Sequence, residues 1–580
     1  MKANGHRWGV ILLAGLLVCA GAQTTEAQSK EAQPQSRTEN GPVLRATTRL
    51  VQLNVIVEDR HGKAVGGLRP EDFQLWDNGK ARKIALFVSE RERKASAAAV
   101  AESEAKPAAN VFDNRAEAGE ASQGSVTVVL FDALNTSFSD QAHAKAEILA
   151  FLRQLRPQDH VAVYLLTKRL TVINEFTQDA ESLLAAVERL RTAPSLLELK
   201  ANQAYVSPSD TGLQDPKAAL RAANLTNEMN STLSDIANVE RMQITAQALE
   251  GIANHVAGVP GRKNLIWVSG SFPVSIAMSS NERSPVDLQS QNFAPEMERV
   301  ARAFSQANLA IYPVDAHGLI IPSDFDAGVA HPLRQYGSPL TPPAGVEEQA
   351  TMRMLADRTG GRAFINTNDI QGAIRSTLAE SQASYQLGFY PEHESWDGKF
   401  HELKLRTKKS GLSLHYRKGY FALEEAQREA ETARAALQRA MWSPVDASAV
   451  GVKVKVEAIE LATRKMDLRV NVAAGELRLD ESDGRHRGKL DAIYLQLGAG
   501  DAAVAADPLS YQVDLTEQQY QVALERGYPL VAKLVIRPET RALRVVVRDA
   551  GSGEMGSVTI PLEKFMPAQN AAQTAPAGAH

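Results

Sequence analysis

The chain has 580 residues, with 64 Lys and Arg against 68 Asp and Glu, a formal net charge of −4, and a single cysteine, Cys19. At about 100–200 residues per domain, this length predicts roughly three to five domains. The 44 % hydrophobic and 23 % charged fractions are typical of a globular protein rather than a disordered one. The near-neutral charge argues against a general nucleic-acid binder, which needs a basic face. One cysteine excludes an intramolecular disulfide, a thiolate zinc site and a Cys-x-x-Cys redox pair.

The first residues have the pattern of an export signal. Lys2 and Arg7 precede the apolar run 10–18 (VILLAGLLV), which is followed by the small residues Ala-Gly-Ala. We therefore expect a signal peptide over residues 1–22, with residue 27 as the alternative end, and export to the periplasm or beyond the cell.

Cleavage would leave a mature chain without cysteine. Lipid attachment at Cys19 is a less favoured alternative, because Leu17 and Val18 are bulkier than the small residues that usually precede a lipidated cysteine. A further alternative is that the signal segment is not cleaved and stays as a membrane anchor. The apolar run is too short to span a bilayer as a helix, and no later segment is long enough, so we expect no transmembrane segment in the mature chain.

Residues 45–90 predict a small N-terminal β-domain. The alternation of apolar and polar residues in 51–58 indicates a half-buried strand, and the Asp-Asn-Gly-Lys sequence at 77–80 indicates a hairpin turn. Residues 91–124 are rich in Ala, Glu, Lys and Ser without apolar periodicity, which is typical of a linker.

Residues 125–383 alternate between strand and helix patterns, which predicts an α/β domain with an open, doubly wound, mostly parallel sheet. Its first strand, 125–131 (SVTVVLF), is apolar throughout, as expected of a central strand covered on both faces. We expect further strands at 161–166, 170–176, 264–268, 309–314 and 362–366, and helices at 140–155, 180–190, 242–256, 295–307, 347–359 and 369–381. Residues 191–240 are interpreted as an insertion.

The pattern then returns to strands. Residues 384–422 predict a β-hairpin extension, and 423–442 a helical connector. Seven short alternating segments within 450–566 predict a C-terminal β-sandwich. The Ala, Gln and Pro-rich tail 567–580 is expected to be disordered.

The α/β region resembles a von Willebrand factor A (VWA) domain, and the chain is similar to the exported bacterial proteins of the VWFA-related domain family. The matching stretches run in order along the chain: FDALNT at 131–136, DHVAVY at 159–164, PGRKNLIWVSG at 260–270, IYPVDAHG at 311–318, TGGRAF at 359–364 and YRKGYF at 416–421, with LRPEDF at 68–73 in the N-terminal unit. The resemblance implies a VWA (Rossmann-like) fold, and it implies little about activity.

VWA domains typically hold a divalent cation at the carboxyl ends of their strands, in a site built from an Asp-x-Ser-x-Ser loop, a later Thr and a later Asp. The resemblance places Asp132 and Thr136 in the loop, with Leu134 at a position where the family supplies oxygen. It further implies that Asn135, Thr245 and Ser269 belong to the site, although Ser269 is neutral where the family has an acid. The resemblance thus implies a degenerate site that holds Mg²⁺ or another divalent cation weakly at most.

Asp315 ends the next strand along the chain and is expected on the same rim, where it would contact a partner. A purely structural interpretation stays open, in which Asp132 and Asp315 accept backbone N–H bonds and Asn135 and Thr136 cap a helix.

No catalytic constellation is evident. Trp267 stands where the nucleophile elbow of a hydrolase needs glycine, and the histidines lack metal-binding spacing. We therefore expect a non-enzymatic, exported, multidomain binding or adhesion-type protein. It would recognise a protein or a cell-envelope surface through this degenerate rim. A metal-assisted hydrolase at the same rim and a structural envelope component with a metal-free VWA domain are the alternatives.

Overall fold

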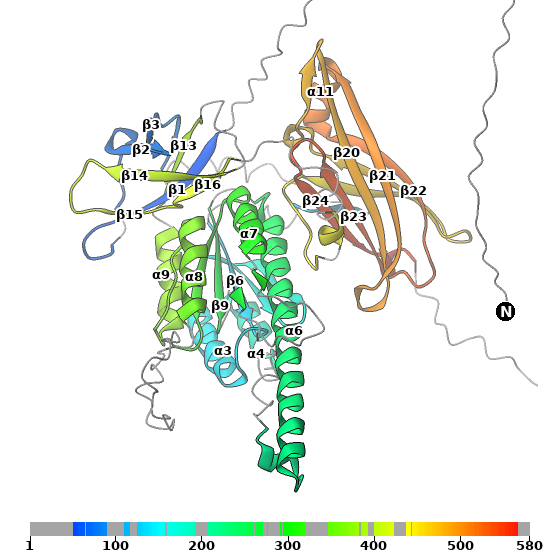
Figure 1. Cartoon of the computed structure of the whole chain (residues 1–580). Helices are drawn as coiled ribbons and strands as arrows, with labels where there is room; N and C mark the ends of the chain where they lie inside the picture. The colour runs from blue at the N-terminus through cyan, green and yellow to red at the C-terminus, as the bar shows by residue number, and fades with distance from the viewer. Residues whose placement is uncertain are drawn as a thin grey trace, which may run out of the picture. The chain divides into compact units, whose positions relative to one another are not determined.

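A computed structural model of the chain describes residues 50–63, 65–89, 110–115, 125–156, 159–191, 206–259, 262–270, 275–276, 291–292, 294–318, 346–381, 384–391, 399–422, 437–441 and 443–566. These residues form a β-domain, an α/β domain and a C-terminal β-sandwich (Figure 1). The predicted signal peptide with Cys19, the C-terminal tail, most of the linker and most of the connector lie outside them. No helix in this described part is both long and apolar enough to cross a membrane.

The α/β domain contains the expected mostly parallel sheet, in the order β12-β9-β6-β7-β8. Its central strands are β6 (Val126–Asp132), β7 (His160–Leu166), β9 (Lys263–Ser269) and β12 (Leu309–Asp315), all parallel, and β8 (Leu170–Thr177) is the antiparallel edge. Every residue of β6 is buried, as its uninterrupted apolar run predicts.

Helices cover both faces of this sheet. Apolar residues of α6 (Pro216–Val256), α7 (Ala294–Gln306) and α8 (Val346–Thr359) form one core against it. Those of α3 (Phe138–Leu152), α4 (Ala180–Glu188) and α9 (Ile370–Ser381) form the other. The expected strand at 362–366 is reduced to a single bridge between Val314 and Phe364. Here Gly361 lies so close to β12 that an added Cβ would sit 1.8 Å from the carbonyl oxygen of Ile311.

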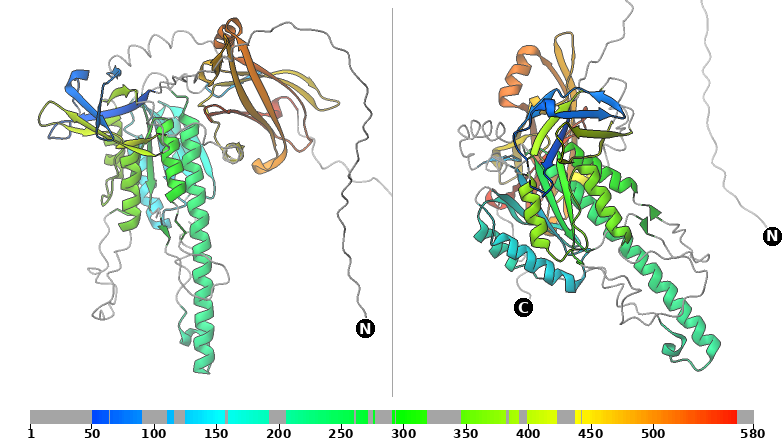
Figure 2. Two further views of the ribbon diagram at one scale, coloured as in Figure 1. Left: turned by 45° about the horizontal axis from the view of Figure 1, so that its top comes forward. Right: turned by 90° about the vertical axis from the view of Figure 1, so that its left-hand side faces the viewer.

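The second half of the predicted insertion 191–240 is helical. Residues 216–240 continue without a break into the expected helix at 242–256, which gives the single helix α6 of 41 residues. Its N-cap is Asp215, whose side chain accepts a hydrogen bond from the backbone N–H of Lys217, with Pro216 in the first turn. The Asp-Pro pair is therefore a helix start. The first half of α6 extends beyond the sheet (Figures 1 and 2).

The predicted hairpin extension at 384–422 is a second half of the N-terminal β-domain. Strand β13 (Ser384–Phe389) pairs antiparallel with β1 (Val51–Glu58), and β14 (Phe400–Thr407) pairs with β2 (Phe73–Asp77). With β3 (Lys80–Arg82), β4 (Leu86–Val88), β15 (Ser413–His415) and β16 (Gly419–Phe421), they form two four-stranded sheets around one core.

The C-terminal domain has the expected pair of sheets, with an addition from the predicted linker. One sheet contains β17 (Val452–Glu460), β18 (Lys465–Val472) and β22 (Tyr528–Val535). The other contains β19 (Asp480–Ser482), β20 (Arg485–Leu497), β21 (Ala503–Thr516), β23 (Ala542–Asp549) and β24 (Met555–Pro561). Helix α11 (Glu517–Arg526) follows β21. Residues 111–113 of the predicted linker are strand β5 (Val111–Asp113), which pairs with β17.

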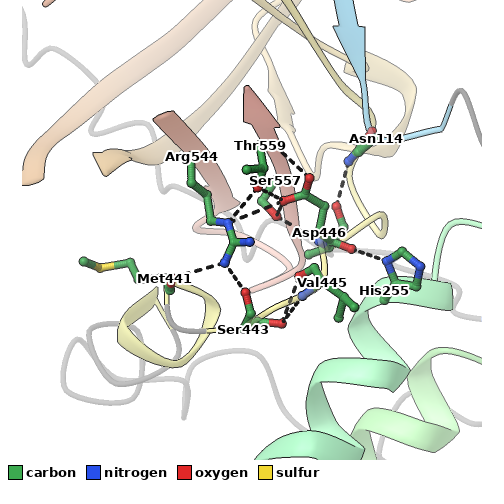
Figure 3. Close-up of polar contacts among 10 residues, drawn as sticks. Asn114, His255, Met441, Ser443, Val445, Asp446, Arg544, Ser557 and Thr559 are labelled. Carbon is green, nitrogen blue, oxygen red and sulfur yellow. Dashed lines mark hydrogen bonds and ion pairs between the residues drawn. The ribbon is translucent and has the colours of Figure 1, made fainter. Parts of the chain in front are cut away.

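A polar junction joins α6 to the segment that enters the sandwich (Figure 3). The Nδ1 atom of His255 lies 2.6 Å from the carbonyl oxygen of Asp446, and its Nε2 atom lies 3.6 Å from Glu175 on β8. The carboxylate of Asp446 accepts hydrogen bonds from the hydroxyls of Ser557 and Thr559, both on β24. The junction thus depends on a histidine that faces a carboxylate.

Candidate functional site

The sheet topology brings the sequence-predicted residues together. Asp132, Ser269 and Asp315 end the adjacent strands β6, β9 and β12, because parallel strands present their carboxyl ends at one edge. Asn135 and Thr136 lie in the loop between β6 and α3, and Thr245 lies on α6. All six side chains are buried, with 0–2 % of each residue exposed.

The carboxylate of Asp132 is enclosed by hydrogen-bond donors. Its Oδ1 accepts from the backbone N–H of Asn135 at 3.0 Å. Its Oδ2 accepts from the Asn135 amide at 2.7 Å, from the Trp267 indole nitrogen at 2.9 Å and from the Ser269 hydroxyl at 2.9 Å. Oδ2 thus accepts three of these four bonds, and Oδ1 accepts one.

The hydroxyl oxygens of Thr136 and Thr245 are engaged in hydrogen bonds as well. The Thr136 hydroxyl donates to the backbone carbonyl of Asp132 at 2.5 Å and accepts from the backbone N–H of Gly270 at 2.9 Å. The Thr245 hydroxyl donates to the carbonyl of Arg241 and accepts from the Asn135 amide at 2.8 Å. The cluster therefore ties the loop after β6 to β9 and α6.

This arrangement does not fit a coordination shell as it stands. A cation would have to replace hydrogen bonds at Asp132, Thr136 and Thr245, and Leu134 is an apolar, buried side chain in the same loop. Burial raises the pKa of Asp132, while the hydrogen bonds from Asn135, Ser269 and Trp267 act in the opposite direction. In the described residues, no group of three or more His, Cys, Asp or Glu side chains could hold a metal ion. Divalent-cation binding therefore stays a prediction.

Asp315 lies at the expected end of its strand, but its side chain is buried there. It is 2 % exposed and therefore does not itself present a carboxylate to a partner. Its Oδ1 accepts from the backbone N–H of His317 at 3.0 Å and lies 3.2 Å from the ring Nδ1 of the same residue. Its Oδ2 accepts from the Gln349 amide at 3.3 Å. Asp315 thus orients His317, which is the partly exposed member of the pair.

His317 connects this strand end to the start of α3. Its Nε2 lies 4.0 Å from Asp140, with 35 % of the His317 side chain and 27 % of the Asp140 side chain exposed. A Cβ on Gly270 would lie 3.0 Å from the His317 ring. The absence of a side chain at Gly270 is therefore what lets the imidazole lie over the buried cluster.

Phe138, Asp140 and His317 were not identified from the sequence as candidate site residues. Phe138 is the first residue of α3 and is 49 % exposed, next to the N-cap Ser137, whose hydroxyl donates to Asp140 at 2.7 Å. An apolar ring at the start of a helix that follows a strand-end aspartate was the available signal. We call Phe138, Asp140 and His317 the outer rim. They lie above the buried cluster of Asp132, Asn135, Thr136, Thr245 and Ser269.

The α/β domain has a von Willebrand factor A-like fold. It has a mostly parallel sheet with an antiparallel edge strand and helices on both faces. Asp132 ends a strand and has Thr and Ser partners. The resemblance implied these features. No protein-family model and no curated protein matches the sequence.

Solved structures similar to the chain include three with VWA or related domains. The vWF domain of the type V pili tip protein Mfa5 from Porphyromonas gingivalis is 10 % identical over 44 % of this chain and 94 % of its own, with a TM-score of 0.25. An aerotolerance-related membrane protein from Bacteroides fragilis is 12 % identical over 44 % and 98 %, with a TM-score of 0.23. The SpRpn10 VWA domain is 10 % identical over 44 % and 96 %, with a TM-score of 0.20. With TM-scores this low, the fold assignment rests on the sheet topology.

Proposed function

We propose that the protein is a non-enzymatic binding protein that recognises a protein partner on the cell envelope through the outer rim of its VWA-like domain. The observation that carries this proposal is the exposure of Phe138, an aromatic residue that is 49 % exposed at the start of α3, two residues before the Asp140 that lies 4.0 Å from His317. Aromatic anchors with a polar surround are typical of the residues that dominate binding energy at protein interfaces.

The buried cluster supports the outer rim in this proposal. Its hydrogen bonds hold the loop after β6 against β9, which fixes the start of α3 and with it Phe138. Recognition then needs no metal, because the hydrogen bonds do the structural work that a cation would do. Asp132 is buried and accepts four hydrogen bonds from the protein, which supports binding over the metal-assisted hydrolase that the sequence left open.

The test is a pull-down from envelope extract with the full chain, with and without chelator. Phe138→Ser should lose the captured protein, and chelator should not change the capture. Leu461→Ser is the matched control, because Leu461 is a similarly exposed apolar residue on the C-terminal domain, 63 % exposed. Equal capture by both variants would contradict a role for the outer rim, and loss on chelation would restore a metal-dependent mechanism.

Export is a further part of the proposal. It rests on the sequence of residues 1–22, which lie outside the described part of the chain. N-terminal sequencing of the protein from cell fractions should give a chain that starts at residue 23, or at residue 28 if the alternative site is used. An intact N-terminus in the cytoplasmic fraction would contradict it.

A further inference from the structure

The first half of α6, Pro216–Glu240, forms an arm that extends past the carboxyl ends of the strands (Figure 2). The helix contacts the buried cluster at Thr245 and continues away from it toward its N-terminus. At 1.5 Å per residue the arm is roughly 37 Å long. It is therefore a large, exposed feature on the same side of the domain as the outer rim.

One face of the arm is covered within the chain. Ala219 and Ala223 are buried under the short helix η3 (Pro208–Thr211). The Asn227 side chain both accepts from the backbone N–H of Val206 at 2.9 Å and donates to its carbonyl at 3.0 Å. This bracing holds the arm as a preformed helix.

Another face of the arm carries an apolar seam that includes exposed side chains. Leu225, Met229 and Ile236 are 60, 58 and 52 % exposed. Together with Ala218 and Ala222, they are spaced 4, 3, 4 and 7 residues apart. This is the a/d spacing of helices that pack against another helix. Such a seam on a soluble arm indicates a partner helix.

The seam is complementary to itself when two copies run antiparallel. If the two-fold axis crosses between residues 223 and 224, Ala222 lies opposite Leu225 of the second copy, and Ala218 lies opposite Met229. Both of these layers then pair one small with one large side chain, which is how facing helices interdigitate, and Ile236 lies beyond the paired segment. A parallel pair would instead place alanine against alanine and leucine against leucine.

The charges beside the seam favour the same arrangement. Arg221 and Glu228 lie seven residues apart, on the same flank of the seam. In the antiparallel register above, Arg221 of each copy faces Glu228 of the other, which forms two ion pairs around the two-fold axis. A parallel in-register pair would place like charges at the same level.

We infer that the arm is a homodimerisation element, through which two copies of the chain pair antiparallel along the seam of Ala218, Ala222, Leu225 and Met229. The interface is isologous, as expected of a two-fold dimer. Because the axis lies about 21 residues from Thr245, the two outer rims would be roughly 65 Å apart along the paired arms. This inference is independent of the rim's proposed function and supplies two rims to one assembly.

The first test is sedimentation analysis of the full chain over a range of concentrations. We expect a monomer–dimer equilibrium that Leu225→Glu weakens at least tenfold, with the far-UV circular dichroism of the folded chain unchanged. Leu461→Glu, at an exposed leucine outside the arm, is the matched control and should dimerise normally. A chain that stays monomeric at every soluble concentration would overturn the inference, as would a dimer that Leu225→Glu leaves intact.

The register has its own test. Arg221→Glu and Glu228→Arg should each weaken the dimer severalfold, and the double swap should restore it. With Cys19 replaced by serine, an Ala218→Cys protein mixed with a Met229→Cys protein should be joined by a short thiol cross-linker. The Met229→Cys protein alone should not be joined to a second copy of itself. Cross-linking of Met229→Cys to itself in place of the mixture, or failure of the double swap to restore dimerisation, would overturn the antiparallel register.

Discussion

The indole nitrogen of Trp267 donates a 2.9 Å hydrogen bond to Oδ2 of Asp132, so a core side chain occupies one lone pair of the residue that VWA domains use as a metal ligand. The two residues lie on adjacent strands, and both are buried completely. The tryptophan that rules out a nucleophile elbow in the sequence thus has a role as a donor to the strand-end carboxylate.

Replacing Trp267 with phenylalanine should destabilise the protein by about 1–3 kcal/mol beyond the effect of the lost volume, because a buried carboxylate loses a donor. Urea denaturation measures this loss. In a double-mutant cycle with Asp132→Ala, the two changes should be strongly non-additive, since each removes one partner of the same bond. Additive effects would show that the bond contributes nothing to stability.

Mg²⁺ or Mn²⁺ at millimolar concentration should leave the thermal midpoint of the protein unchanged. The reason is that a cation would have to displace hydrogen bonds at Asp132, Thr136 and Thr245. Differential scanning calorimetry with metal and with chelator provides the measurement. A metal-induced rise that Asp132→Ala abolishes would instead establish the weak divalent site that the VWA resemblance implies.

The junction at His255 should make stability depend on pH. Burial lowers the pKa of His255, but its interactions with Glu175 and Asp446 outweigh burial and leave the pKa above its ordinary value. The Tyr164 ring, with its centroid 6.2 Å from that of the imidazole, also packs against it. Because the folded-state pKa is raised, this contribution is fully present below about pH 6.5 and is lost as the pH rises through the folded-state pKa.

We therefore expect His255→Gln to cost about 1–3 kcal/mol near pH 6 and less near pH 9. Urea midpoints across this range give the difference between the wild type and the variant. His143→Gln, at an exposed histidine of α3, is the matched control and should show no such trend. A difference that does not change with pH would mean that His255 acts through its shape alone.

Replacing Arg362 should strongly lower the stability of the protein. One nitrogen lies 3.0 Å from Glu58 on β1 and 2.7 Å from Glu380 on α9, and both carboxylates are at least nine-tenths buried. Burial raises the pKa of Glu380, and the charge of Arg362 opposes that rise. Arg362→Met would leave two facing carboxylates without their cation, at a cost of about 3–5 kcal/mol near pH 7.

This cost should shrink as the pH falls, because protonation removes the repulsion between the two carboxylates. Unfolding experiments at pH 7 and pH 5 test both statements. Arg375→Met, at an exposed arginine of α9 that bonds Gln154, is the control and should change stability little. An equal loss of stability in the two variants would contradict the proposed role of Arg362 between the two buried carboxylates.

The sequence predicted best what is local. The apolar run of β6 and the alternating strand and helix patterns identified the α/β sheet, because each element carries its own periodicity. The sequence did not predict the pairing of strands that lie far apart along the chain. The alternation in β1 shows that one face is buried, but nothing in it shows that the paired strand begins more than 320 residues later at Ser384. Strand β5 is only three residues long, too short to show a period.

The candidate site shows the same division. Strand ends and the resemblance located Asp132, Ser269 and Asp315 correctly at one edge of the sheet. Their burial depends on Trp267 reaching across to Asp132 and on His317 covering Gly270, and neither side-chain position follows from spacing along the chain. Likewise, an Asp-Pro pair such as Asp215 and Pro216 is common both in turns and at the start of helices. The burial of Ala219 and Ala223 on one helix face shows that a helix starts here.

The strand pairings also determine how the chain can be divided. The β-domain takes strands from 51–88 and 384–421, and the sandwich takes β5 from 111–113 and its remaining strands from 452 onward. These two sets interleave along the sequence, so no single cut separates one complete domain from another. A fragment that starts after residue 422 would lack β5, and one that ends before residue 384 would lack the partners of β1. Synthesis must therefore pass residue 389 before β1, the first strand of the β-domain, has its partner β13 complete.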